Sequence, residues 1–155
     1  MSEPIRTLAV KDLCTALSTV PDLKTIKRVQ PRPIDLQVVP LPAAYIYDVL
    51  PETRARNGAW AIGKMEIAIV VFMDLTVMDA STGNLEFSDY VDVIQAKLHA
   101  ALNSSTNTGN KVITELKELR AERVVSSETY GELNLTIEVT YQHKRGDAFT
   151  TDISK

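Results

Sequence analysis

The chain has 155 residues, of which 45% are hydrophobic and 24% are charged, the usual balance of a soluble domain. One domain is expected at this length, and a net charge of −3 does not indicate a nucleic-acid-binding protein. Cys14 is the single cysteine, which excludes an internal disulfide and favours a reducing compartment. The sequence starts without a signal-peptide pattern, and no apolar run approaches the roughly 20 residues that cross a bilayer. We therefore expect synthesis in the cytoplasm and no membrane partner.

The first third of the chain predicts one helix and one short strand. Residues 5–20 have apolar side chains at three- and four-residue spacing, which is typical of an amphipathic helix. Pro4 suits the first helical position because its missing N–H would be unpaired there, and Pro21 ends the pattern. Residues 25–29 alternate weakly and predict a short strand. The four prolines in residues 31–42 then predict a rigid, extended connection.

The most informative segment is residues 41–77. Two strongly apolar strands, residues 43–50 and 65–73, flank a polar connection, residues 51–60. Sequential strands usually pair, so the segment predicts a β-hairpin with a loop much longer than usual. Long loops in compact domains are normally functional or disordered. We expect the whole connection, residues 51–63, to project from the sheet, to be flexible in the free subunit and to become ordered on assembly.

Charge is unevenly distributed along the chain. Residues 1–64 carry nine basic and six acidic side chains, whereas residues 65–96 carry six acids and neither lysine nor arginine. These acids are Glu66, Asp74, Asp79, Glu86, Asp89 and Asp92. The pattern predicts one acidic region on the folded surface, which would repel DNA or receive a basic partner.

A turn and a second helix follow the hairpin. Residues 79–84 combine glycine, asparagine and aspartate and predict the turn. Ser88 is the expected helix cap, with Asp89 and Asp92 favourable to the helix dipole. The helix then ends in a polar loop, residues 103–110. Its buried stripe is expected to comprise Val91, Ile94, Leu98, Ala101 and Leu102.

The last third predicts a hairpin followed by a polar arm. Residues 111–120 fit either a helical turn or a strand, and we favour a short helical turn followed by a strand. The final strand alternates cleanly over residues 133–141 and is expected to pair with its predecessor through a turn near Gly131. Residues 1–143 are expected to form one domain, and residues 144–155 a polar, mobile C-terminal arm.

The order of elements is helix, strand, long hairpin, helix and hairpin. Both helices need an apolar platform, and the alternating strands offer one apolar face. The sequence therefore predicts an α+β fold: a mainly antiparallel sheet with two α-helices packed on one face and a long extended hairpin.

Motifs that carry chemistry are missing from the sequence. His99 and His143 stand outside any motif, and a structural role is expected for each. Cys14 lies next to the apolar face of the first helix and is expected to be an inert, buried small hydrophobe and not a reactive thiol. No zinc spacing, EF-hand loop, phosphate-binding glycine motif or nucleophile elbow occurs. Carboxylates brought together by folding remain an open route to catalysis, but we expect no enzyme, no metal site and no cofactor.

Aromatic and arginine residues of the hairpin are the main candidates for recognition. Trp60 is either a core residue at the base of the hairpin or an interface anchor. Tyr45 and Tyr47 are expected on one face of their strand and partly buried. Arg54 and Arg56 lie on the connection, and arginine and tryptophan are typical of interface hot spots. The hairpin is therefore the predicted contact with other macromolecules.

These elements, taken in order, resemble the tail-terminator (tail-completion) proteins of long-tailed bacteriophages. The resemblance covers residues 5–143. It is carried by the N-terminal helix, the strand entry at residues 41–47 and the polar hairpin ending in Trp60. The alternating strand at residues 64–69, the helix after Ser88 and the terminal hairpin complete it.

The resemblance implies a virion structural protein of the tail and neck, assembled in the host cytoplasm. Such a subunit forms a homo-oligomeric ring, typically a hexamer, that caps the tail tube, stops its growth and receives the head–tail connector protein. The partners implied are the tail tube protein, the connector protein and, in a contractile tail, the sheath protein, while DNA only passes through the ring.

The interface residues expected on this basis lie in the hairpin and the start of the arm: Arg54, Arg56, Asn57, Trp60, Lys144 and Arg145. The acids expected to face the channel are Asp79, Glu86 and Asp89. Alternatives are another neck or head–tail connector component, a bacterial α+β ligand-binding or adaptor domain, or a small carboxylate enzyme. An enzyme would show a deep pocket with titratable residues of perturbed pKa.

Overall fold

The computed structural model describes residues 4–28, 40–48, 52–74, 84–105, 113–125 and 130–144. Two helices, α1 (Ile5–Ser18) and α2 (Asn84–Ser105), accompany a mixed, mostly antiparallel sheet. Its strands are β1 (Thr25–Lys27), β2 (Ala43–Tyr47), β3 (Glu52–Asn57), β4 (Trp60–Asp74), β5 (Ile113–Val125) and β6 (Tyr130–Lys144). Neither described helix has a stretch long and apolar enough to span a membrane.

The sheet is built around β4 and β6, which pair antiparallel along their full length from Trp60 opposite Lys144 to Asp74 opposite Tyr130. The strand order is β1-β2-β4-β6-β5, and β3 also pairs with β4, next to β2 along the same edge. Among the described strands, only β1 and β2 run parallel. Strand pairing thus makes a long central ribbon whose two ends have different neighbours.

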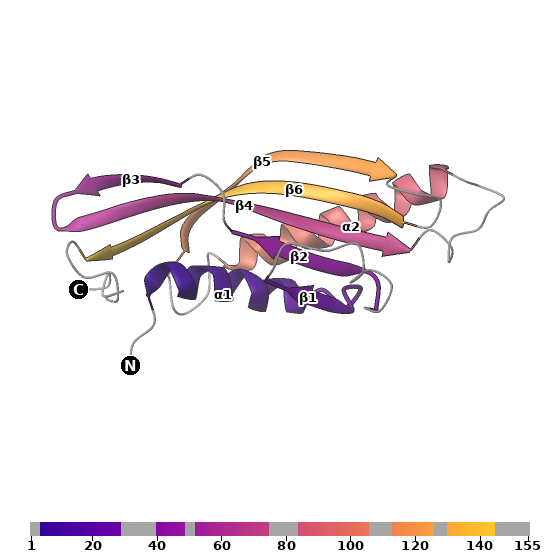
Figure 1. Ribbon diagram of the computed structural model, residues 1–155, viewed down its shortest axis with the longest axis horizontal. Helices are drawn as coiled ribbons and strands as arrows, with labels where there is room; N and C mark the ends of the chain where they lie inside the picture. Colours follow the sequence, from indigo (N-terminus) through magenta and orange to yellow (C-terminus); the bar gives the residue numbers. More distant parts are fainter. Residues whose placement is uncertain are drawn as a thin grey trace.

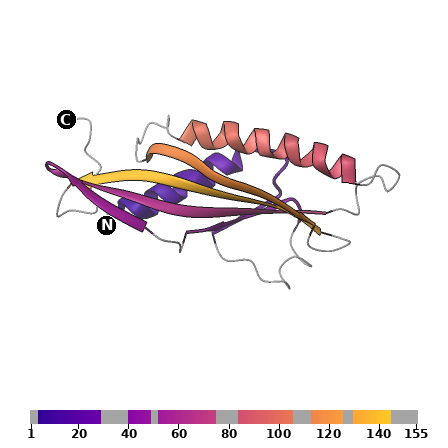
Figure 2. The same ribbon diagram turned by 90° about the horizontal axis from the view of Figure 1, so that it is seen from above.

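Both helices pack on one face of the sheet, as Figure 2 shows. Alternate residues of the two central strands point to the helices and pair across the ladder, for example Ile67 with Ile137 and Ile69 with Leu135. Burying one such side chain is worth roughly 1.5–3 kcal/mol. The predicted α+β fold with two helices on one face is therefore confirmed. The stripe expected for α2 is buried: Val91, Ile94, Leu98, Ala101 and Leu102.

Several predicted boundaries were wrong. Helix α1 starts after Pro4, which is the N-cap residue, and the side chain of Thr19 closes its end by donating to the Ala16 carbonyl at 2.6 Å. Helix α2 starts at Asn84, so Ser88 lies inside it and is not the cap. The earlier start also moves Asp89 and Asp92 out of the first turn, where the helix dipole acts.

The prediction for the residues before the last strand was also wrong. Residues 113–120 form strand and not a helical turn, because β5 pairs with β6 from Ile113 onward, with two register shifts. Gly131 lies within β6, opposite Met73 and Val125, and the turn expected near it falls in residues 126–129, outside the described residues. The buried alternation of residues 133–141 is confirmed. Residues 31–39 of the predicted extended connection, residues 79–83 of the predicted turn and residues 145–155 of the predicted arm lie outside the described residues.

Candidate functional site

The expected long loop is a regular β-hairpin. Strand β3 pairs with β4 from Glu52 opposite Met65 to Asn57 opposite Trp60, leaving only Gly58 and Ala59 as the turn. Gly58 has φ 60, a left-handed conformation that glycine adopts without steric cost. The prediction of an open connection at residues 51–60 was therefore wrong for residues 52–60. The missed signal was Gly58, since a glycine at the first of two turn residues marks a tight hairpin.

This element, here called the projecting hairpin (residues 52–64), extends beyond the helix-covered body. Figures 1 and 2 both show its tip past the start of α1, beside the end of β6. Six residues of β3 span about 20 Å at the usual rise per residue. The hairpin thus presents a narrow, twisted ribbon that no described helix covers.

The predicted interface residues gather at this tip. Arg54 has 61% of its side chain exposed, and Arg56 is also exposed. Trp60 is half-buried at the first residue of β4, next to the turn and outside both buried clusters, so its placement in the core at the hairpin base was wrong. Asn57 and Lys144 lie opposite Trp60 on the two neighbouring strands, and the description covers only their backbone. Arg145 lies outside the described residues.

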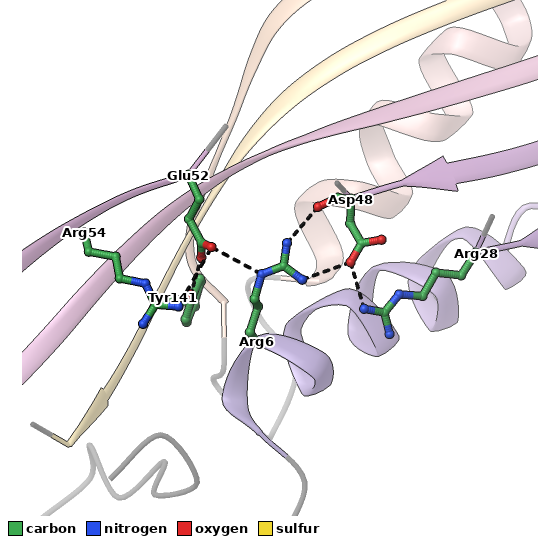
Figure 3. A network of polar contacts seen from close by, with 6 residues as sticks. All are labelled: Arg6, Arg28, Asp48, Glu52, Arg54 and Tyr141. Carbon is green, nitrogen blue, oxygen red and sulfur yellow. Dashed lines mark hydrogen bonds and ion pairs between the residues drawn. The ribbon is translucent and has the colours of Figure 1, made fainter. Parts of the chain in front are cut away.

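A polar cluster anchors the base of the hairpin to the body, and we call it the root cluster (Arg6, Arg28, Asp48, Glu52, Tyr141; Figure 3). Arg6 of α1 donates to the Asp48 carboxylate at 3.0 Å and to the Asp48 carbonyl at 2.7 Å. Arg28 donates to the same carboxylate oxygen at 2.8 Å. Arg6 also lies 3.4 Å from Glu52, the first residue of β3, which accepts a hydrogen bond from Tyr141. The root cluster therefore ties α1, the ends of β1 and β2, and β6 to the hairpin.

Burial, hydrogen bonding and nearby charges shift the pKa values of Asp48 and Tyr141 in opposite directions. Burial alone would raise the pKa of Asp48, but hydrogen bonds and charge from Arg28 and Arg6 outweigh it and lower that pKa below 3.8. Burial and the hydrogen bond to Glu52 raise the pKa of Tyr141 to about 12. Asp48 is therefore a fixed negative charge and Tyr141 a fixed hydrogen-bond donor at neutral pH.

A glycine permits the close packing at this root. Gly63 is opposite Tyr141 in the ladder, and a Cβ at position 63 would lie 2.6 Å from the Tyr141 hydroxyl oxygen. Only a residue without a side chain fits beneath that ring. The tyrosine thus covers the glycine and also holds Glu52, which fixes the direction in which the hairpin leaves the sheet.

Sequence reasoning missed the root cluster. Arg6, Asp48 and Glu52 lie 42 or more residues from at least one of their partners, and none belongs to a local motif. Only the fold brings them together. No local signal in the sequence could have found this site.

The acidic stretch does not form one surface. Glu66 points to the sheet face away from the helices, whereas Asp89 and Asp92 are exposed on α2, on the opposite side of the sheet. Asp92 is also paired with Arg123 of β5. The prediction of one acidic region was wrong, because the stretch passes from one side of the sheet to the other. Asp79 and the Glu86 side chain lie outside the described residues, so a channel-facing role for Asp79, Glu86 and Asp89 stays a prediction.

The sheet face away from the helices, here called the open face, is covered by no described helix or strand. Tyr45 and Phe72 pack edge to face on it, with ring centroids 5.8 Å apart. Tyr45 and Tyr47 share this face as predicted, although Tyr45 is fully buried. A hollow of about 330 Å³ lies in the open face, lined by Tyr47, Ala68, Val70, Phe72, Glu132, Asn134, Leu135 and Thr136.

The remaining candidates for chemistry are dispersed. His99 lies 2.6 Å from Glu118, while His143 is buried and stacks on Tyr141. Cys14 is partly buried against the core, which raises the pKa of its thiol. In the part of the chain that the structure describes, no three His, Cys, Asp or Glu residues come together as metal ligands. The absence of an active site and of a cofactor stays a prediction.

No protein-family model and no curated protein matches the sequence. Among solved structures, a chain of "Virion of native gene transfer agent (GTA) particle" superposes with a TM-score of 0.37 and 15% sequence identity. The match covers 86% of this chain and 91% of that chain. A likeness at this level carries no argument about function.

Proposed function

We propose that this protein is a tail-terminator subunit of a long-tailed phage-type particle. The observation that carries the proposal is the projecting hairpin, an exposed ribbon with Arg54, Arg56 and Trp60 on a two-helix α+β body. The order of elements, which resembles that family over residues 5–143, supports the same role. The function is structural, without catalysis or a cofactor.

In this role each subunit contacts its neighbours through two different patches. Such heterologous contacts close into a ring when the rotation between subunits allows it. A projecting ribbon is suited to reach over a subunit boundary, and its two exposed arginines and half-buried tryptophan are residue types that dominate interfaces. We propose a homo-oligomeric ring, a hexamer by resemblance, that caps the tail tube protein and receives the connector protein.

The ring would lie in the tail and neck of the virion. DNA would pass through it as cargo, and a sheath protein would meet it if the tail is contractile. Lys144, the last residue of β6, is opposite Trp60 in the ladder, so the end of this strand lies beside the proposed contact. We propose Lys144 and Arg145 as further contacts on this basis.

The test is electron microscopy of tail tubes polymerised with and without the purified protein. We expect rings of the free protein and tubes that carry a ring at one end and stop at a defined length. Tubes of unchanged length, with no cap and no ring in the free protein, would contradict the role. Binding to an isolated connector without capping tubes would instead support the alternative of another neck component.

A further inference from the structure

We infer that the hollow in the open face is the docking site for the projecting hairpin of a second copy of this chain. This inference rests on the proposed ring and adds to it the surface that receives the hairpin. Trp60 supplies the aromatic side chain that enters the hollow. Tyr47, Val70 and Asn134 belong to the lining that receives it.

The two patches lie far apart on the same subunit. Trp60 begins β4 and Val70 lies ten residues further along it, a separation of about 33 Å. A hairpin cannot reach the hollow of its own subunit, because both patches belong to one continuous strand. Contact between them must join two copies head to tail, which is the heterologous geometry that makes rings.

Charge is complementary between the patches. Residues 53–64 of the hairpin contain Arg54, Arg56 and Lys64 and no acid. The charged side chain in the lining of the hollow is Glu132, which makes no ion pair with the described residues. A basic tip approaching an acidic hollow gains both attraction and orientation.

A hydrogen-bond acceptor in the hollow that is unpaired among the described residues, and the volume of the hollow, also favour a side chain as its occupant. The side-chain oxygen of Asn134 is buried and has no hydrogen-bond partner among the described residues. Such an acceptor is costly unless it receives a donor, and the indole N–H of Trp60 is a donor with an apolar ring attached. The hollow, at about 330 Å³, is at the small end of binding pockets and suits one large side chain.

The experiment uses two full-length variants that each lose one side of the contact. Trp60→Ala removes the tip and keeps the hollow, whereas Val70→Lys places a positive charge in the hollow and keeps the tip. We expect each variant alone to be monomeric where the parent protein forms rings, with at least about a 30-fold weaker subunit contact. In an equimolar mixture, the intact tip of Val70→Lys can still bind the intact hollow of Trp60→Ala. The mixture should therefore give dimers and no larger species.

The control is Val93→Lys, the same substitution at an exposed valine of α2 on the other side of the sheet, which should assemble as the parent does. Mass photometry counts the species, and circular dichroism confirms folding. If Val70→Lys does not fold, Thr136→Lys tests the same hollow. Because Trp60 is the only tryptophan, its fluorescence emission should shift to shorter wavelength on assembly of the parent and not in Val70→Lys.

The outcomes separate this inference from the proposed function. Rings that cap tubes in both the parent and a folded Val70→Lys protein would overturn the hollow as the docking site and leave the tail-terminator role intact. A mixture that gives no dimers would also overturn it. A parent protein that stays monomeric and does not cap tubes would overturn both.

Discussion

Strand β4 runs through both the helix-covered body and the projecting hairpin, and the two regions differ in how far their side chains are buried. In the body, residues such as Ile67 and Ile69 are fully buried beneath two helices. In the hairpin, β4 lies between β3 and the end of β6 with no described helix over it, and the β3 side chains from Thr53 to Arg56 are exposed. Burial of apolar side chains in the body therefore contributes most of the free energy of folding. The hairpin instead exposes surface that another molecule can bury. The root cluster joins the two regions, and substitutions in each should separate their roles.

The largest effect on folding is expected in the body. Leu98→Ala should lower the free energy of unfolding by about 3 kcal/mol, because it removes a fully buried side chain of α2 and leaves a cavity. Chemical denaturation measures this loss. Val93→Ala, on the same helix but 49% exposed, is the matched control and should change stability by less than about 0.5 kcal/mol. Similar losses at both positions would mean that α2 does not pack as described.

A smaller effect is expected at the root. Asp48→Asn should cost about 2 kcal/mol at pH 7, because it removes charge-assisted hydrogen bonds from Arg6 and Arg28. The folded pKa of Asp48 lies below its ordinary value of 3.8, so this stabilisation is present above pH 3.8 and is lost as the pH falls through the folded pKa.

Urea denaturation at several pH values measures the difference between the parent and Asp48→Asn. The difference should be constant between pH 5 and pH 7 and should shrink below pH 4. A difference that grows on acidification would contradict the lowered pKa.

Substitution of Gly63, the glycine beneath Tyr141, tests the packing at the root of the hairpin. Gly63→Ala should cost about 1.5 kcal/mol, because its methyl group would overlap the Tyr141 ring. Thermal melting of a double-mutant cycle with Tyr141→Ala measures the coupling. The cost of Gly63→Ala should fall sharply when the ring is gone. Equal costs in both backgrounds would show that the ring does not restrict this position.

The smallest effect on folding, and the largest on assembly, is expected at the tip. Arg54→Ala combined with Arg56→Ala should leave the melting temperature almost unchanged, since Arg54 is mostly exposed and its ion pair with Glu52 is long at 3.9 Å. The same pair of changes should weaken ring formation or tail binding by about 2 kcal/mol. A folded double variant that assembles and binds tails like the parent would remove these arginines from the interface.

The sequence predicted the parts that depend on local periodicity. Apolar spacing in α1 and α2 and alternation in β6 gave the two-helix α+β fold. The prediction from sequence failed where strand pairing decides the structure. Residues 113–120 form strand because β6 provides a long partner. The expected loop is strand because Gly58 permits a two-residue turn. The contacts between Arg6, Asp48, Glu52 and Tyr141 were unpredictable, since they join residues distant in the chain.

Amide hydrogen exchange, measured on the free subunit and on the assembled protein, compares the two regions in one experiment. Amides of β4 and β6 beneath the helices should exchange slowly in both states, since their opening approaches global unfolding. Amides of β3 should exchange faster in the free subunit and become strongly protected on assembly. Protection of the hairpin that is the same in both states would contradict its role as the assembly element.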